Sequence, residues 1–317
     1  MRTLAAIRTH RWGEDEERLL ASLRPVFGDD VAVVFHDRPE NLKPPVRVAD
    51  ISGAWVADNG FRPIQKWGWQ CGDYFYYRLR DAFPAYDRIW LIEPDVFFSS
   101  DPAGFFSACA DAPEDVLGLR PGPRVGRGAF GEIGDLRPSR AIFALTRLSA
   151  RAIDILADLR RIYCQLPPGR WKFANDETFV FSHAFAREDL TVGDMETYAP
   201  GWFDGVQFDT DPDILLEAIS GEWHVPGRAY HPVRSRDSFK AALTSRFGNG
   251  INWLSGMKSS IDELDDTDID DIAGGVADIV RWRLHRIRNN RRLAAQVSEK
   301  RQALAAAVEV ADTGETR

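Results

Sequence analysis

Apolar residues in the first half of the chain follow two alternating spacings, one typical of strands and one typical of helices. Arg2–Thr9 and Val31–Phe35 are short apolar runs, whereas Glu14–Phe27 repeats its apolar residues at helical spacing. This order predicts a strand, a helix and a second strand. Val46–Ile51 predicts a further strand, and the aromatic-rich segment Ile64–Phe83 predicts one helix.

The segment Arg88–Phe98 contains the strongest strand pattern in the chain. Its continuous apolar run is typical of a strand that is covered on both faces, so we expect a central strand of a parallel sheet. Val116–Leu119 and Ala141–Leu145 predict further strands, and Ser149–Tyr163 predicts a helix with one apolar face. Alternating strands and helices predict an α/β sandwich with one mostly parallel central sheet.

The last part of the chain has a different pattern. Residues 262–271 are strongly acidic, and residues 281–292 are strongly basic within a sequence of helical composition that continues to about Val310. We therefore expect an α/β domain over residues 1–246, an acidic linker over 247–271 and a C-terminal helical appendage over 272–317.

Composition and charge restrict the class of protein. The formal net charge of −8 argues against nucleic acid as a partner, because binding phosphates requires a basic surface. The three cysteines form no CxxC pair, which argues against a disulfide framework. No apolar run reaches the length of a membrane span, and a charge follows too soon after Met1 for a signal peptide. We expect a cytoplasmic protein, with the inner face of the membrane as a peripheral location.

Two acidic residues, Glu93 and Asp95, follow the apolar strand directly. Ligands of parallel α/β sheets bind beyond the carboxyl ends of the strands, so both carboxylates stand where a binding site is expected. Residues i and i+2 of an extended segment point the same way, so both can face one divalent cation. The alternative is that Glu93 caps a turn and Asp95 begins an ordinary loop.

The segment Tyr86–Phe98 resembles the DxD region of GT-A glycosyltransferases, in which an apolar strand ends in two acids that hold a divalent ion and a nucleotide-sugar diphosphate. The order of the surrounding elements is similar over roughly Arg2 to Val233. The resemblance implies that Asp95 is a direct metal ligand and that Glu93, which stands where the family usually has an aspartate, acts through water or the donor ribose. It implies Mn²⁺ or Mg²⁺ as the cofactor.

Two segments offer further groups for a nucleotide. Arg8, Thr9 and His10 follow the first strand with guanidinium, hydroxyl and ring groups, and by position they resemble the family's uridine-side loop. In the second segment, the spacing of Lys66, Gln70 and Asp73 predicts one helix face that meets the nucleotide-sugar. The alternatives are a solvated lead-in to the first helix and an aromatic segment that simply fills the core.

Later positions match the family at two more places. Asp176 and Glu177 stand at a predicted helix start, where the resemblance implies a base that deprotonates the acceptor in inverting enzymes, although acids at helix starts are also ordinary caps. Which of the two acts stays open. His231 stands where the family often supplies a third metal ligand; a structural role, and competition from His224, are the alternatives.

These observations predict a metal-dependent glycosyltransferase of polysaccharide biosynthesis. It would move a sugar from a nucleotide-sugar, with a UDP-sugar as the first guess, to a saccharide or lipid-linked acceptor. A nucleotidyltransferase and a non-catalytic carbohydrate-binding or assembly protein of the same fold are the alternatives. For the C-terminal helix we expect packing on its own domain or on a second copy, as in a homo-oligomer, in preference to an anionic membrane surface.

Overall fold

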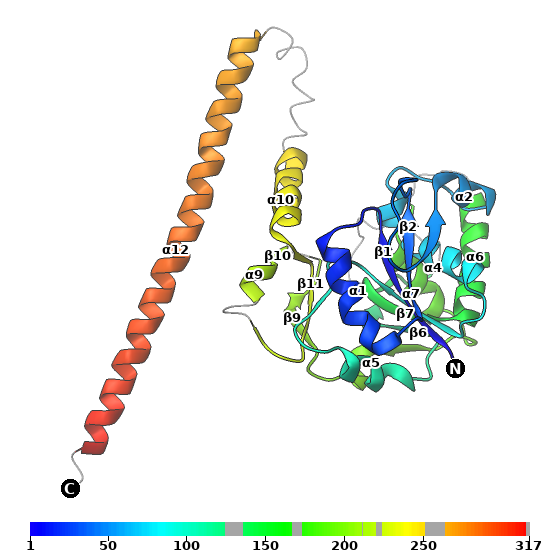
Figure 1. The fold of residues 1–317 in the computed structure, drawn as a ribbon, viewed down its shortest axis with the longest axis horizontal. Helices are drawn as coiled ribbons and strands as arrows, with labels where there is room; N and C mark the ends of the chain where they lie inside the picture. The colour runs from blue at the N-terminus through cyan, green and yellow to red at the C-terminus, as the bar shows by residue number, and fades with distance from the viewer. Residues whose placement is uncertain (124–135, 167–172, 211, 220–223, 251–263, 315–317) are drawn as a thin grey trace. The chain divides into compact units, whose positions relative to one another are not determined.

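The computed structural model describes residues 1–123, 136–166, 173–210, 212–219, 224–250 and 264–314 (Figure 1). The chain divides into two compact units, Met1–Thr244 and Ser245–Arg317. The first unit contains sheets as well as helices. The described part of the second unit is mostly helical.

A seven-stranded sheet forms the centre of the first unit. Its strands are β1 (Thr3–Thr9), β2 (Val31–His36), β3 (Arg47–Ile51), β4 (Arg88–Ile92), β6 (Val116–Pro123), β7 (Ser139–Ser149) and β8 (Val192–Asp194). They lie in the order β3-β2-β1-β4-β7-β6-β8. β1 is parallel to both of its neighbours, β2 and β4, and the β2–β3 and β6–β8 pairs are also parallel. β7 is antiparallel to both β4 and β6. The predicted mostly parallel sheet is confirmed.

The strand β4 lies in the middle of this sheet, between β1 and β7. Its residues pair with β1 in the register Leu4↔Ile89 and with β7 in the register Ile89↔Leu148. All five residues of β4 are buried. The strand is apolar throughout its run because helices cover both of its faces and neighbouring strands pair with both of its edges, as expected from the sequence.

Helices cover both faces of the sheet, and alternate residues of each strand contact one face or the other. In β1, Leu4 and Ala6 belong to one core and Ala5 and Ile7 to the other. The first core is covered by α2 (Gly53–Asp58), α4 (Asp73–Ala82), α6 (Ala150–Gln165) and α7 (Asp176–Phe185). The second is covered by α1 (Glu14–Phe27), α5 (Ala103–Ala110) and α8 (Met195–Tyr198).

The prediction of a single helix over Ile64–Phe83 is wrong. The chain instead forms a short helix, α3 (Trp67–Gln70), which ends at Cys71 before α4 begins at Asp73. Gly72 lies between them, and a Cβ atom at this position would overlap the side chains of Arg8 and Asp176. The glycine thus serves a close approach of the backbone and interrupts the helix, so Asp73 belongs to a different helix from Gln70.

Two small sheets accompany the main sheet, and their strands follow it along the chain except for β5 (Phe97–Phe98), which lies between β4 and β6. One consists of β5, β11 (Ala229–His231) and β9 (Phe203–Phe208), and the other of β10 (Ile214–Leu215) and β12 (Val233–Arg234), with α9 (Leu216–Ile219) after β10. β11 pairs with β5, which comes five residues after the end of β4. Residues near position 230 are thereby brought to the carboxyl end of the central strand.

Two helices complete the described chain, α10 (Arg236–Gly250) and α12 (Asp266–Gly314). The boundary between the two compact units falls within α10, after Thr244. The C-terminal helix is present as expected, but it begins at Asp266 and not at Ile272, since aspartates are favoured in a first helical turn. No described helix combines the length and the hydropathy needed to cross a membrane.

Candidate active site

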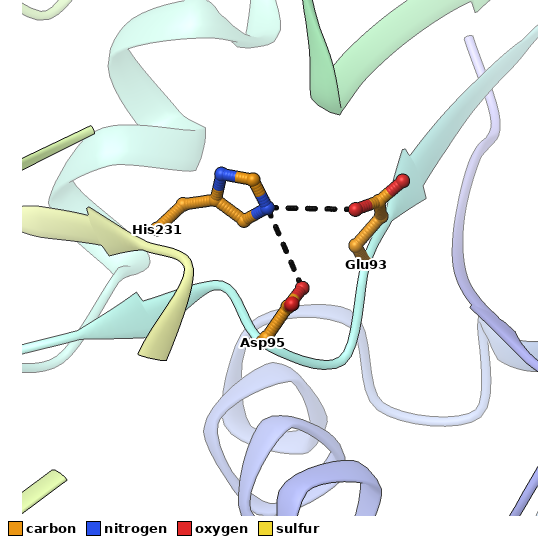
Figure 2. Close-up of side chains that lie close together, drawn as sticks. All are labelled: Glu93, Asp95 and His231. Atoms are coloured by element: carbon orange, nitrogen blue, oxygen red, sulfur yellow. Dashed lines mark ion pairs between the residues drawn. The ribbon is translucent and has the colours of Figure 1, made fainter. Parts of the chain in front are cut away.

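Three side chains from two distant segments meet at the carboxyl end of β4 (Figure 2). Glu93, Asp95 and His231 each offer one potential ligand atom, and these atoms lie within 4.8 Å of one another. The Nε2 atom of His231 lies 3.4 Å from Glu93 Oε2 and 3.5 Å from Asp95 Oδ1. The two acids face the same point. They lie in a turn after β4, closed by the hydrogen bond from the amide of Val96 to the carbonyl of Glu93 (3.1 Å), and not in the extended segment that the i, i+2 argument assumed.

Backbone contacts fix this arrangement. The amide of Glu93 donates to the carbonyl of Ala144 (2.8 Å), which extends the strand pairing to the first acid, and the amide of Val233 donates to the carbonyl of Asp95 (2.7 Å). His231 Nδ1 lies 2.7 Å from the carbonyl oxygen of Asp209. Because a carbonyl can only accept, Nδ1 carries a hydrogen, and Nε2 is the nitrogen that faces the carboxylates.

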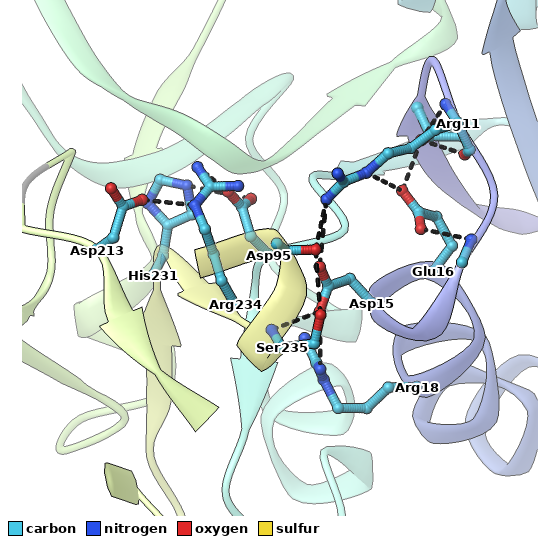
Figure 3. A network of polar contacts seen from close by, with 12 residues as sticks. Arg11, Asp15, Glu16, Arg18, Asp95, Asp213, His231, Arg234 and Ser235 are labelled. Atoms are coloured by element: carbon cyan, nitrogen blue, oxygen red, sulfur yellow. Dashed lines mark hydrogen bonds and ion pairs between the residues drawn. The ribbon is translucent and has the colours of Figure 1, made fainter. Parts of the chain in front are cut away.

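Two guanidinium groups flank the acids. Arg8 Nη1 lies 3.1 Å from Glu93 Oε1, and Arg234 Nη2 lies 3.2 Å from Asp95 Oδ2. Arg234 also pairs through Nε with Asp213 at 2.5 Å, as Figure 3 shows. Both arginines are thus held by protein carboxylates on one side and border the cluster on the other.

The first turn of α1 contacts the residue that directly follows β12. Asp15 is 2% exposed and accepts a hydrogen bond from the amide of Ser235 (3.0 Å), the residue after Arg234 (Figure 3). Arg18 donates to the same carboxylate at 2.9 Å. An acid at a helix start is favoured by the helix dipole, and here it also anchors the strand that carries Arg234.

Electrostatics in the cluster favour the charged forms of its members. Burial alone would raise the pKa of Glu93, but Arg8 and His231 lower it to about 2. Burial alone would lower the pKa of His231, but Asp95 and Glu93 raise it to about 10. Without another cation, the imidazolium therefore supplies positive charge between the two carboxylates.

The cluster fits a divalent cation. Its ligand atoms are two carboxylate oxygens and an imidazole nitrogen, a set that suits Mn²⁺ well. Asp95 Oδ1 is a buried atom without a hydrogen-bond partner in the described part of the chain. In addition, carboxylates outnumber guanidiniums in the surrounding ion pairs: Glu93, Asp95, Asp176 and Asp213 against Arg8 and Arg234.

A second acidic pair, Asp176 and Glu177, begins α7. Asp176 is 4% exposed, and its Oδ2 accepts hydrogen bonds from the amide of Gly72 (2.8 Å) and from Arg8 Nη1 (3.4 Å). Its Oδ1 accepts from the amide of Glu177 at 2.8 Å. Asn175, not either acid, is the N-cap, because its side chain accepts from Thr178. The two acids lie in the first turn, where the helix dipole favours them, but neither of them is the cap.

Both acids have raised pKa values for the same main reason. Burial raises the pKa of Asp176 to about 7, against the opposing effect of Arg8. Burial, and then the neighbouring charge of Asp176, raise the pKa of Glu177 to about 7. Glu177 is only partly buried, so its carboxylate reaches solvent more readily than that of Asp176. A carboxylate with a pKa near neutrality is suited to accept a proton.

Arg8 connects the two acidic groups. The same Nη1 atom that contacts Glu93 also contacts Asp176, and Nη2 donates to the carbonyl oxygens of Gly68 and Trp69, each at 3.1 Å. Arg8 is 7% exposed. It therefore holds α3, the cluster and the start of α7 together.

The remaining predicted residues lie outside this cluster. Thr9 is buried and bonds Glu16 through its hydroxyl (2.7 Å), whereas His10 and Lys66 are exposed and Gln70 is partly exposed. Asp73 is fully buried beneath the site, where it pairs with Arg160. The expected common face of Lys66, Gln70 and Asp73 is thus absent. Of the two histidines considered, His231 joins the cluster and His224 is exposed.

Sequence reasoning missed Arg234 and Asp213, and it did not identify the groups that approach Gly72. The one signal available for Arg234 was its position three residues after His231, within the same strand-loop segment. Gly72 stood in a segment whose two glycines, Gly68 and Gly72, were unusual for a helix, and that oddity marked a close backbone approach.

Comparisons with known proteins give distant structural likeness alone. No family model matches the sequence, and no curated protein matches it. A solved structure described as a glucose-1-phosphate thymidylyltransferase from Bacillus anthracis is 12% identical, covers 61% of this chain and 86% of its own, and has a TM-score of 0.38. The inositol-1-phosphate CTP transferase from T. maritima is 10% identical, with coverages of 62% and 86% and a TM-score of 0.36.

A third solved structure is a glycosyltransferase involved in the glycosylation of the major capsid of PBCV-1. It is 10% identical, covers 68% of this chain and 87% of its own, and has a TM-score of 0.36. All three are transferases by their descriptions. Likeness this distant assigns no activity to the present chain.

Proposed function

We propose that this protein is a metal-dependent glycosyltransferase that moves a sugar from a nucleotide-sugar donor to a saccharide or lipid-linked acceptor. The observation that carries the proposal is the cluster of Glu93, Asp95 and His231 at the carboxyl end of the central strand, close to the pair Asp176 and Glu177, whose pKa values are raised. The first group suits a cation beside a diphosphate, and the second suits a proton acceptor.

The three clustered side chains would hold Mn²⁺ or Mg²⁺. When bound, such a cation supplies positive charge for the diphosphate that leaves the sugar. Asp95 is the stronger candidate for a direct ligand, because its Oδ1 has no hydrogen-bond partner among the described residues. Arg234, which contacts Asp95, is placed to add a guanidinium to the same phosphates.

Glu177 is our candidate for the base that removes a proton from the acceptor hydroxyl. Both carboxylate oxygens of Asp176 already accept hydrogen bonds from backbone or guanidinium groups. Glu177 is partly exposed, and its pKa is raised to about 7 by burial and by the charge of Asp176. Asp176 then acts as a positioning residue that fixes Arg8 and the start of α7.

The donor nucleotide is identified by a binding screen. UDP-sugars are our first choice, and GDP- and CMP-sugars are the alternatives. Each donor is added with Mn²⁺ and, separately, with the metal chelated, while the melting temperature of the full chain is followed. A ligand that binds the folded protein alone raises this temperature, so we expect a shift that requires both the donor and the metal. A chain that responds to no donor would contradict the proposal.

The reaction type is identified from the product. Glycosyl transfer, or slow donor hydrolysis without acceptor, releases a nucleoside diphosphate from a UDP- or GDP-sugar and CMP from a CMP-sugar. Incubation of a sugar phosphate with a nucleoside triphosphate would release pyrophosphate if the protein were a nucleotidyltransferase. A protein that binds donor and forms neither product is the non-catalytic binder.

A further inference from the structure

The helix α12 carries opposite charges in two neighbouring segments. The acidic segment, residues 266–271, contains four aspartates: Asp266, Asp268, Asp270 and Asp271. The basic segment, residues 281–292, contains six arginines: Arg281, Arg283, Arg286, Arg288, Arg291 and Arg292. Figure 1 shows α12 as one uninterrupted helix, so both segments lie on the same straight element.

An exposed apolar stripe joins these two segments. Ile269, Ile272, Val276 and Ile279 follow one another at spacings of three and four residues, which places them along one side of a helix. Their exposed fractions range from 45% to 67%. Ile287, two turns beyond Ile279, is 50% exposed and extends the stripe into the basic segment.

We propose that α12 pairs with α12 of a second copy of this chain in an antiparallel dimer. A pairing centred on Asp278 places Ile269 opposite Ile287 of the second copy and Val276 opposite Val280. This register covers the apolar stripe of each copy with that of the other.

The same register brings opposite charges together on both flanks of the pair. From the helical repeat of 3.6 residues, Asp266 and Arg291 lie on one flank, and Asp271 and Arg286 lie on the other. Arg283, which points into the stripe, lies opposite the small side chain of Ala273. The alkyl stem of Arg283 can therefore cover apolar surface while its charged end reaches solvent.

The direction of pairing follows from the charges. A parallel pair would align the acidic segments with each other and the basic segments with each other, which like charges disfavour. The antiparallel pair aligns each acidic segment with a basic one.

A second copy fits this helix better than an anionic lipid surface does. A helix that lies in a membrane interface separates its basic and apolar faces. Here Arg283 and Arg286 lie on the same side as Ile279, and Arg281 and Arg288 lie on the opposite side. The aspartates of the acidic segment would also be repelled by anionic headgroups.

Sedimentation velocity of the full chain is the first test. We expect a concentration-dependent dimer at about 50 mM salt that weakens at about 500 mM, because the charge pairs are exposed and are screened by salt. A chain that stays monomeric at both salt concentrations, up to about 100 μM protein, overturns the proposal.

Charge reversal tests the pairing itself. The variant with Asp266→Arg and Asp271→Arg, and the variant with Arg286→Asp and Arg291→Asp, should each dimerise about tenfold more weakly than the wild type, and an equimolar mixture should form a heterodimer. The matched control is Arg281→Asp with Arg292→Asp, which makes the same charge change on the outer side of the helix and should leave the dimer intact. Equal weakening in the control, or no recovery in the mixture, contradicts the register.

Thiol cross-linking tests the direction. The three native cysteines are buried, so introduced cysteines are the ones that react with a short bismaleimide. Ile269→Cys mixed with Ile287→Cys should cross-link, whereas Ile269→Cys alone should not, because its two copies would lie about 27 Å apart. Cross-linking of Ile269→Cys to itself would show a parallel pair. A monomeric chain that sediments with phosphatidylserine vesicles would assign the helix to a membrane surface and overturn the dimer.

Discussion

Arg160 and Asp73 form an ion pair in which neither side chain is exposed, with Nε of Arg160 2.8 Å from Oδ2 of Asp73. Arg160 also donates through Nη1 to the carbonyl of Ala174 (3.0 Å), and its guanidinium lies over the ring of Phe179 at 4.1 Å. Asp73 directly follows Gly72, whose amide binds Asp176. The buried pair thus supports Asp176 and Glu177 in two ways, through Ala174 before the start of α7 and through Gly72.

Breaking this pair should destabilise the protein strongly. Arg160→Met leaves the carboxylate of Asp73 buried and unpaired, and we expect the free energy of unfolding to fall by about 3–5 kcal/mol. Urea denaturation gives this value. Arg160→Met combined with Asp73→Asn should cost less than the sum of the two single changes, and strict additivity would show that the two groups do not interact.

Gly72→Ala should remove transfer activity while the protein still folds. A methyl group at position 72 overlaps Arg8 and Asp176, so one or both must move. We expect a loss of at least about tenfold in kcat, measured as nucleoside diphosphate release. Gly122→Ala is the matched control, since a Cβ there meets no atom within 4 Å. Full activity of Gly72→Ala would show that the positions of Arg8 and Asp176 do not matter for the reaction.

Metal binding should depend on the two strand-end acids to different degrees. Asp95→Asn should abolish the Mn²⁺-dependent thermal shift, whereas Glu93→Gln should reduce it, because Oδ1 of Asp95 is a buried atom without a hydrogen-bond partner among the described residues. Isothermal titration with Mn²⁺ gives both affinities. Asp29→Asn, an exposed change after α1, serves as the control. Wild-type affinity in Asp95→Asn would end its assignment as a ligand.

The transfer rate should fall as the pH drops through about 7. Glu177 must be deprotonated to accept a proton, and its pKa is raised to about 7. The pH profile of kcat should therefore show an acidic limb near this value, and Glu177→Gln should lose transfer and keep donor binding. If Asp176→Asn alone loses transfer while Glu177→Gln keeps it, the base is Asp176.

Asp176 should also make stability depend on pH. Its pKa is about 7 in the folded protein against 3.8 as the ordinary value, so between these pH values the folded state holds a proton that the unfolded state releases. The free energy of unfolding therefore falls as the pH rises through this window, by up to about 1.4 kcal/mol per pH unit. Asp176→Asn has no such proton and should gain stability relative to the wild type from pH 4 to pH 7, as followed by urea denaturation. A constant difference between the two proteins would contradict the raised pKa.

Elements with a local cause could be predicted from the sequence. The central place of β4 followed from the apolar run Ile89–Ile92, whereas Glu93 and Asp95 meet because of the turn that follows the strand, which the sequence argument did not include. The two glycines indicated a close backbone approach, but the groups that approach Gly72 could not be predicted, because Arg8 and Asp176 come from elements far along the chain. The position of Arg234 in the site could not be predicted for the same reason, because its carboxylate partners, Asp95 and Asp213, are known only from the structure.

The separation of Glu93 and His231 along the chain has a consequence for biosynthesis. His231 follows Glu93 by 138 positions, and its strand β11 pairs with β5 only after all seven strands of the main sheet have been synthesised. A ribosome-bound chain that ends before β11 lacks one of the three clustered side chains. The complete cluster of Glu93, Asp95 and His231 therefore forms late in translation, after closure of a long loop whose entropic cost the preformed sheet reduces.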